Sequence, residues 1–178
     1  MTDRDLQQKR IVAGLIDIGI AVVIWILFAV LTWGATYALG KATGSGAVST
    51  FVPRLLGFAG SLLGLAYILG RDVLAGGRSL GKQIQGLRVV TTSGLPISAM
   101  DSARRNALFA IGSALGLLAS TLQLVPCLGD AVVCMLSPLL FLGGLVSLGI
   151  AIFEIIKITQ DPEGIRMGDQ MAGTRVVR

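Results

Sequence analysis

Four long apolar stretches, separated by short polar segments, dominate the pattern along the chain. They cover residues 11–39, 55–74, 107–125 and 131–158. A helix needs about 20 apolar residues to cross the ~30 Å hydrocarbon core of a bilayer. The first stretch is too long for the apolar core of a signal peptide, so we expect it to be retained. The pattern predicts an all-α integral membrane protein with four transmembrane helices.

A ten-residue segment that follows the second apolar stretch returns after the fourth. Residues 81–90 read GKQIQGLRVV and residues 168–177 read GDQMAGTRVV, 87 positions apart in a chain of 178. We interpret the chain as a single domain, residues 1–178, built by duplication of a two-helix hairpin. The pseudo-repeats are 1–90 and 91–178.

The two copies differ in charge at their second residue, which is Lys82 in one and Asp169 in the other. Near a pseudo-two-fold axis these residues would meet, so we expect a direct ion pair between them, with a gate as the alternative role. The Arg-Val-Val segments that follow, with Arg88 and Arg175, are strand-like, and such an axis makes the pair antiparallel. The sequence thus predicts a small β-ribbon. It also predicts a short amphipathic helix from Ser98, its N-cap, through Asn106.

Composition and charge agree with a membrane protein. Hydrophobic residues make up 53% of the chain and charged residues 14%, against about 25% charged residues in soluble domains. Thirteen of the 15 basic residues fall in the N-terminal tail, the central loop and the C-terminal segment. The positive-inside rule makes these regions cytoplasmic in a multi-pass inner-membrane protein, with both halves in the same orientation. The net charge of +5 therefore needs no nucleic-acid partner.

Several kinds of chemistry are excluded or disfavoured. The chain has no His, so it cannot by itself form a His-ligated metal site or a Ser-His-Asp triad. The glycine-rich segment 76–82 lacks the GxxxxGK[ST] spacing of a phosphate loop. We expect no enzyme activity, no cofactor and no metal site. Cys127 and Cys134 flank the third connection, on the extracytoplasmic side, where they form either a disulfide or two buried thiols.

An ordered set of polar motifs resembles a known family. The set consists of Arg10-x6-Asp17, residues 77–82 (GRSLGK), residues 86–90 (GLRVV), Arg105-Asn106 and residues 166–174 (RMGDQMAGT). It is similar to the RDD family, membrane proteins of bacteria and archaea named for one arginine and two aspartates. The resemblance covers residues 10–177. It implies that Arg10 and Asp17 are the family's arginine and first aspartate, and that Asp169, or alternatively Asp72, is the second. The family has been proposed to transport ions or small ligands, with sodium–proton antiport suggested for some members.

Asp17 is the charged residue that needs the most explanation. It follows Arg10 by two helical turns, about 10.5 Å, so both lie on one face of the helix. A charge at membrane depth costs ~2.5–3.5 kcal/mol and faces the bundle interior. Two interpretations stay open: Asp17 is a proton or cation site, or it forms a buried salt bridge with Arg10, Arg71 or Arg105.

Other charges near the ends of the spans have local interpretations. Glu154 lies three residues before Lys157, so the two form a surface pair, or Glu154 joins Asp17 in a polar cluster. Arg71 and Asp72 are expected to end the second span and to reach the lipid headgroups.

The leading functional hypothesis is a small membrane transporter of monovalent cations with proton exchange, embedded in the lipid bilayer. Its ion-binding residues would be Arg10, Asp17 and Glu154. Its cytoplasmic cap or gate would contain Lys82, Asp169, Arg88 and Arg175. The alternative is a membrane scaffold or assembly factor that docks partners through this cap. A homo-oligomer is expected if the protein transports, because one copy is small for alternating access.

Overall fold

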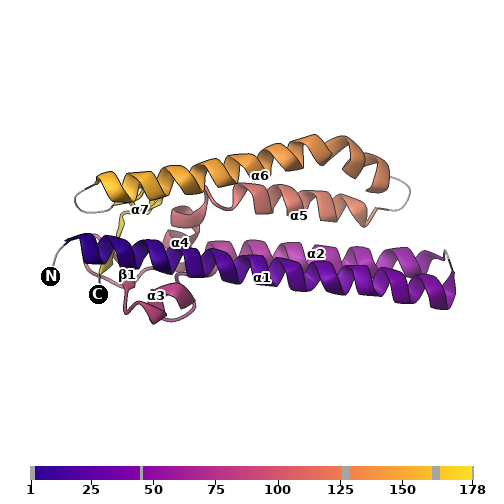
Figure 1. The fold of residues 1–178 in the computed structure, drawn as a ribbon, viewed down its shortest axis with the longest axis horizontal. Coiled ribbons are helices and arrows are strands. Elements are labelled where there is room, and N and C mark those ends of the chain that lie inside the picture. Colours follow the sequence, from indigo (N-terminus) through magenta and orange to yellow (C-terminus); the bar gives the residue numbers. More distant parts are fainter. Residues whose placement is uncertain (1–2, 45, 126–128, 162–164, 178) are drawn as a thin grey trace.

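The computed structural model describes residues 3–44, 46–125, 129–161 and 165–177. The long helices α1 (Asp3–Thr43), α2 (Ala47–Gly70) and α6 (Gly129–Gln160) run side by side with the shorter α5 (Ile111–Gln123) (Figure 1). Three of these helices, α1, α2 and α6, are long and apolar enough to cross a membrane. A fourth crossing results if α4 (Ala99–Asn106) and α5, which meet at 97°, count as one broken span.

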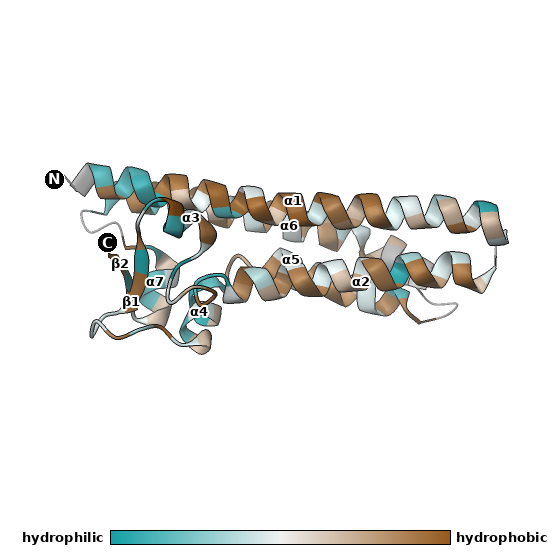
Figure 2. Cartoon of the chain, turned by 90° about the horizontal axis from the view of Figure 1, so that it is seen from below, coloured by the Kyte–Doolittle hydropathy of each residue, from teal (hydrophilic) through white to brown (hydrophobic). Residues whose placement is uncertain are grey.

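The distribution of polarity is that of a protein surrounded by lipid. Large apolar side chains such as Trp25 and Phe141 are exposed along the bundle, whereas most of the fully buried side chains are polar or charged. Figure 2 shows the apolar residues along the bundle and hydrophilic residues gathered at the end where α3, α4, α7 and the strands lie. Exposed apolar side chains are favourable in a bilayer because the lipid tails are apolar. The polar backbone groups, which lipid cannot satisfy, are bonded within each helix.

The helices pack as two pairs. α1 packs along α2, α5 packs along α6, and α2 joins the pairs by contacting α5, while α1 and α6 contact each other only sparsely. Small residues bring each pair together. A side chain at Gly60 would collide with the ring of Phe28, and one at Gly112 would lie 2.7 Å from the Ser147 hydroxyl. Close helix approach at glycine is typical of membrane helices.

The short elements form a cap at one end of the bundle, the end where both chain termini lie (Figure 1). They are α3 (Leu80–Ile84), β1 (Arg88–Thr91), α4, α7 (Met167–Ala172) and β2 (Thr174–Val177). β1 and β2 pair antiparallel, with Val89 opposite Val176 and Arg88 opposite Val177. The predicted ribbon is therefore confirmed, and the equivalent valines of the repeated decapeptide lie opposite each other.

The predicted short helix that begins after Ser98 is also confirmed, as α4. Ser98 caps α4, with its side chain accepting from the Asp101 N–H and Asp101 accepting in return from the Ser98 N–H. The second glycine of each decapeptide, Gly86 and Gly173, has a positive φ, +67° and +59°. Other side chains rarely adopt that conformation, so glycine is favoured where each short helix ends.

The helices differ from the predicted spans at several ends. α1 begins at Asp3 rather than at residue 11, and α2 begins at Ala47 rather than at residue 55. The second helix stops at Gly70 rather than Leu74, because Arg71 and Asp72 turn into the protein interior. The third begins at Ile111 rather than Ala107, because the chain bends sharply between α4 and α5. The 13 residues of α5 span about 20 Å, less than a bilayer core.

Candidate functional site

Nine charged residues gather where the cap meets the helix bundle, and we call them the charge cluster. Its members are Arg10, Asp17, Arg71, Asp72, Lys82, Arg105, Glu154, Arg166 and Asp169. All except the half-buried Arg166 are buried. They come from α1, α3, α4, α6, α7 and the segments that follow α2 and precede α7. Five are basic and four acidic, so the cluster carries one surplus positive charge when all are ionised.

Asp169 is the first centre of the cluster. Arg10 Nη2 donates to Asp169 Oδ2 at 3.0 Å, and Arg105 Nη2 lies 2.8 Å from Oδ1. Arg166 adds a longer contact of 3.5 Å and a backbone N–H bond of 3.2 Å. Burial alone would raise the pKa of Asp169. The three arginines outweigh burial and hold the pKa below its usual range.

Asp72 is the second centre. Lys82 Nζ pairs with its Oδ1, Arg105 Nε lies 3.5 Å from Oδ2, and Asn106 Nδ2 donates to Oδ2 at 3.0 Å. Burial raises the pKa of Asp72, but Lys82 and the neighbouring arginines hold it well below its usual range.

These contacts correct two expectations. Lys82 pairs with Asp72 and not with Asp169, because Arg105 lies between the two acids and already contacts both. Arg71 and Asp72 do not reach the headgroups: their exposed fractions are 7% and 0%.

Asp17 is held by neutral donors. Its Oδ2 accepts from the Ser79 hydroxyl at 2.5 Å and its Oδ1 from the Gly81 N–H at 2.9 Å. Of the two interpretations left open, the structure does not have the buried salt bridge: among the described residues Arg10 and Arg105 pair with other acids, and Arg71 bonds to Asn106. Arg10 and Asp17 share a face of α1 but are not partners. Asp17 nevertheless points inward, as predicted, with an exposed fraction of 2%.

Glu154 is the acid that α6 contributes. Its Oε1 accepts from the Gly168 N–H at 3.3 Å, and Arg166 Nε lies 4.0 Å from its Oε2. Oε2 has no hydrogen-bond partner within the described part of the chain. The expected pair with Lys157 was wrong, since Lys157 donates to Gln170 instead. The alternative, that Glu154 joins Asp17 in a polar cluster, is what the structure has.

The first glycine of each decapeptide docks against the bundle in the same way. Each donates its N–H to a buried acid, Gly81 to Asp17 and Gly168 to Glu154. Each also lies so close to a helix that an added Cβ would overlap a backbone carbonyl oxygen, that of Ala13 or of Arg105. The repeated glycine therefore serves close approach, which the sequence had not indicated.

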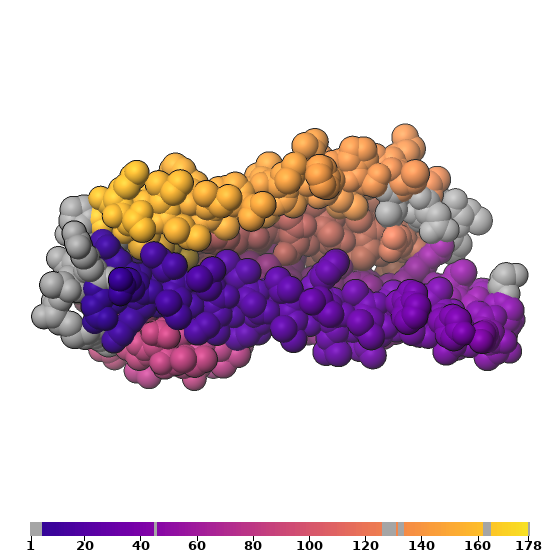
Figure 3. All heavy atoms as spheres, in the orientation of Figure 1, coloured from indigo at the N-terminus to yellow at the C-terminus, as the bar shows by residue number. Residues whose placement is uncertain are grey.

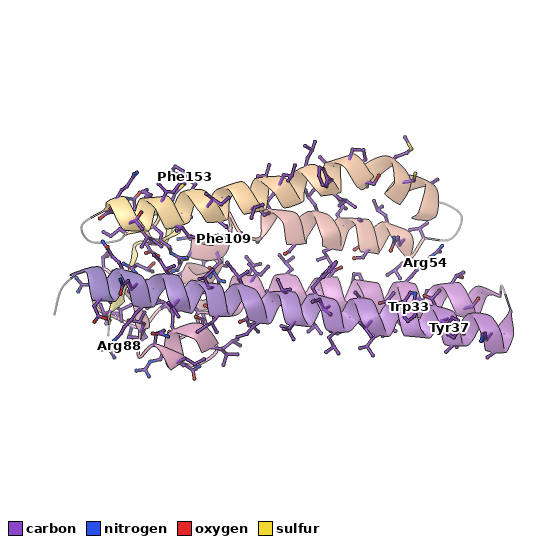
Figure 4. All side chains as sticks on the ribbon, in the orientation of Figure 1. Trp33, Tyr37, Arg54, Arg88, Phe109 and Phe153 are labelled. Carbon is purple, nitrogen blue, oxygen red and sulfur yellow. The ribbon has the colours of Figure 1, made fainter. Side chains whose placement is uncertain are left out.

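Arg71 is the cation of the cluster that lacks an acidic partner. Its Nε and Nη2 both donate to Asn106 Oδ1, at 3.2 and 2.9 Å, and no carboxylate among the described residues lies within ion-pair distance. Its guanidinium lies over the Phe109 ring, 5.7 Å from the centroid, and Arg166 lies 5.9 Å from the same ring. Figure 4 labels Phe109, which lies between α1 and α6 near the cap.

Two cavities meet at the cluster. A small one of about 80 Å³ is lined by Asp17, Glu154 and the five basic residues. A central one of about 1080 Å³ runs between the two helix pairs. Figure 3 shows a hollow between α1 and α6, with atoms of α5 visible behind it. Ile18, Arg71, Phe109 and Ala151 line both cavities and thus form the wall between them.

The sequence did not single out three residues that hold the cluster together. Ser79 holds Asp17, Asn106 bridges Arg71 to Asp72, and Arg166 joins Glu154 to Asp169. Each lies within one of the motifs that resemble the RDD family, and those motifs were the signal in the sequence that could have identified these residues. Two residues assigned to the cap, Arg88 and Arg175, lie exposed on the ribbon, outside the cluster.

A comparison with protein families shows to which family the chain belongs. The model of the RDD family matches residues 7–173. The chain belongs to the RDD family. Arg10, Asp17, Asp72 and Asp169 all lie in the charge cluster of this RDD protein. No curated protein and no solved structure matches the chain significantly.

Two further expectations concern cysteines and metals. Cys134 is exposed on α6, and Cys127 lies outside the described residues, so the disulfide stays a prediction. Within the described ranges, no group of three or more His, Cys, Asp or Glu is arranged to hold a metal ion.

Proposed function

We propose that this RDD protein is a small transporter that exchanges a monovalent cation for a proton at Asp17 and Glu154. The observation that carries the proposal is that both acids, from two different long helices, line the same small cavity next to the central one. Intramembrane acids that face a cavity are functional candidates. A cavity of about 80 Å³ has room for several water molecules, since one water needs about 10–15 Å³.

The carboxylates would work by letting a proton and a cation compete for the same oxygens. Both Asp17 oxygens are held by neutral donors, so the acid carries a charge that no direct ion pair cancels. The Ser79 hydroxyl can rotate and accept instead of donate, which suits a change between the ionised and protonated acid. Glu154 Oε2, without a hydrogen-bond partner in the described residues, would offer the second binding position.

The rest of the cluster would act as the cytoplasmic gate. Arg10, Lys82 and Asp169 tie the cap to α1 and to the end of α2 through the ion pairs described above. Arg71 and Phe109 separate the small cavity from the central one. For a cation to cross the protein, the wall between the cavities and the contacts between cap and bundle would have to open one after the other.

The proposal includes the topology inferred from the sequence. The protein would be a multi-pass inner-membrane protein with both termini and the cap in the cytoplasm, where its basic residues are favoured. Two features support an origin by duplication: Val89 pairs with its equivalent Val176, and Gly81 and Gly168 dock in the same way. Transport by such a small protein would involve a homo-oligomer.

A membrane scaffold remains the second candidate, and one observation favours it. The cap exposes apolar side chains, among them Ile84, Leu95 and Met100, beside the exposed Arg88 and Arg175. Such a surface suits a partner protein. The buried ion pairs would then serve only to fix the cap.

Proteoliposomes that contain a pH-sensitive dye would separate the two candidates. Imposed Na⁺, K⁺ or Li⁺ gradients should move protons in the parent protein. Asp17→Asn and Glu154→Gln should abolish that movement, whereas Asp5→Asn, a surface change near the start of α1, should keep it. Size-exclusion profiles and thermal unfolding would verify that each variant is folded. Absence of proton movement with every cation would overturn the exchange mechanism and favour the scaffold.

A further inference from the structure

The central cavity has the chemistry of a site for a long amphiphile. It is lined by apolar, small and hydroxyl side chains and by the amide of Gln123, and Arg71 is the single charged residue among the described residues that line it. Along α1 its lining extends from Ile18 to Trp33, a rise of roughly 22 Å. A volume of about 1080 Å³ lies at the upper end of the range for ligand pockets.

Arg71 gives this apolar cavity a charged end. The side chain is 7% exposed and uses only Nε and Nη2 in hydrogen bonds, both to Asn106. Nη1 is therefore available to an incoming acceptor, within the part of the chain that the structure describes. Among the described residues Arg71 has no acidic partner at ion-pair distance, and Asp72 and Asp17 act on it only from farther away. A buried cation is costly unless an anion compensates it.

We propose that the central cavity binds a long-chain carboxylic acid, with its carboxylate against the Arg71 guanidinium and its chain between the two helix pairs. A guanidinium matches a carboxylate geometrically and in charge. A single-chain acid fits better than a phospholipid, because only about 80 Å³ lies beyond Arg71 and charged residues already line that space. The hollow between α1 and α6 gives the acid a route from the surrounding bilayer (Figure 3).

This site goes beyond the proposed cation exchange and uses neither of its two ion-binding acids, although Arg71 also belongs to the wall between the two cavities. The exchange depends on Asp17 and Glu154 in the small cavity, whereas the acid would lie in the central cavity. Neither acid lines that central cavity. Binding can therefore be measured without any flux, and each proposal can fail alone.

Both tryptophans of the chain, Trp25 and Trp33, line the central cavity and provide the readout. Both are also largely exposed on the outside of the bundle, so quenching by the methyl ester measures the background from quencher in the detergent. The full chain, purified in an uncharged detergent, would be titrated with a dibrominated stearic acid, whose bromines quench tryptophan fluorescence on contact. We expect saturable quenching by the acid and only weak, non-saturating quenching by its methyl ester. Equal quenching by the acid and the ester would overturn the proposal.

Variants test the two ends of the site separately. Arg71→Gln should weaken binding by roughly tenfold or more, and Arg71→Lys should retain part of the affinity. Gly64→Leu should fill the cavity and reduce binding, since Gly64 lines it and has nothing within 4 Å of its Cβ position. Gly34→Leu is the matched control: its Cβ position is equally open but lies outside the cavity lining.

Two further outcomes would also overturn all or part of the proposal. Unchanged affinity in folded Arg71→Gln, or in Gly64→Leu if Arg71→Gln fails to fold, would overturn the proposal. Complete displacement of the acid by phosphatidylglycerol at lower concentration would overturn the choice of a single-chain ligand.

Discussion

Arg10 and Asp169, 159 positions apart, are joined by a 3.0 Å hydrogen bond between two buried side chains. The bond ties the first helix to the second decapeptide, at the other end of the sequence. Asp169 also lies 2.8 Å from Arg105, so it holds α1, α4 and α7 together. The cap is thereby fixed to the bundle by buried charges, in addition to a small apolar core formed by Ala13, Leu87, Val89, Ile97 and Val176.

Asp169→Asn should therefore be among the most destabilising single changes in the cap. Removing the charge takes away the carboxylate that Arg10, Arg105 and Arg166 share, which costs about 3 kcal/mol or more in folding free energy. Thermal unfolding in detergent would measure this loss. Asp5→Asn is the control: its partner Lys9 lies 3.9 Å away near the surface, and such pairs contribute about 0–1 kcal/mol. Equal effects of the two changes would contradict the role of Asp169.

The docking glycines give a matched pair of predictions. Gly81→Ala and Gly168→Ala should each destabilise the protein by about 1–3 kcal/mol, because the new methyl group meets a backbone carbonyl that cannot move away cheaply. Gly116→Ala is the control, since its Cβ position is open and alanine favours a helix by about 1 kcal/mol. We expect it to be neutral or stabilising. Tolerance of alanine at Gly81 or Gly168 would show that the close approach is not required.

Much of this fold could be predicted from the sequence, because its signals are local. The apolar runs indicated the long helices, Ser98 indicated the start of α4, and the repeated Arg-Val-Val indicated the ribbon. The sharp bend after Asn106 could not be predicted, because Asn106 is held by residues of a distant segment, Arg71 and Asp72.

The membership of the candidate site was predictable, but its pairings were not. The polar motifs supplied most of the cluster, yet the sequence paired Lys82 with Asp169 and Glu154 with Lys157. Within one helix, spacing defines which side chains are close, as for Arg10 and Asp17. Partners on different elements depend on packing, and here Gly81 and Gly168 determine how α3 and α7 approach the bundle.

The depressed pKa values of Asp72 and Asp169 predict resistance to mild acid. A carboxylate whose pKa is lower in the folded state contributes all its stability above the unfolded value of 3.8. That contribution is lost as the pH falls below 3.8 towards the folded pKa, because the unfolded chain takes up the proton first. The midpoint of thermal unfolding should stay nearly constant from about pH 7 to about pH 5 and fall below about pH 4. A main loss of stability near pH 6 would contradict these shifts.

A double-mutant cycle would test which acid Lys82 pairs with. Lys82→Met and Asp72→Asn should each destabilise the protein, and the double variant should be more stable than the sum predicts, by about 0.5–3 kcal/mol. The same cycle with Lys82 and Asp169 should give a smaller coupling, because Arg105 stands between them and contacts Asp72 through Nε and Asp169 through Nη2. Unfolding in detergent at neutral pH provides all the required free energies. A larger coupling for Lys82 with Asp169 would instead favour the pair expected from the repeated decapeptide.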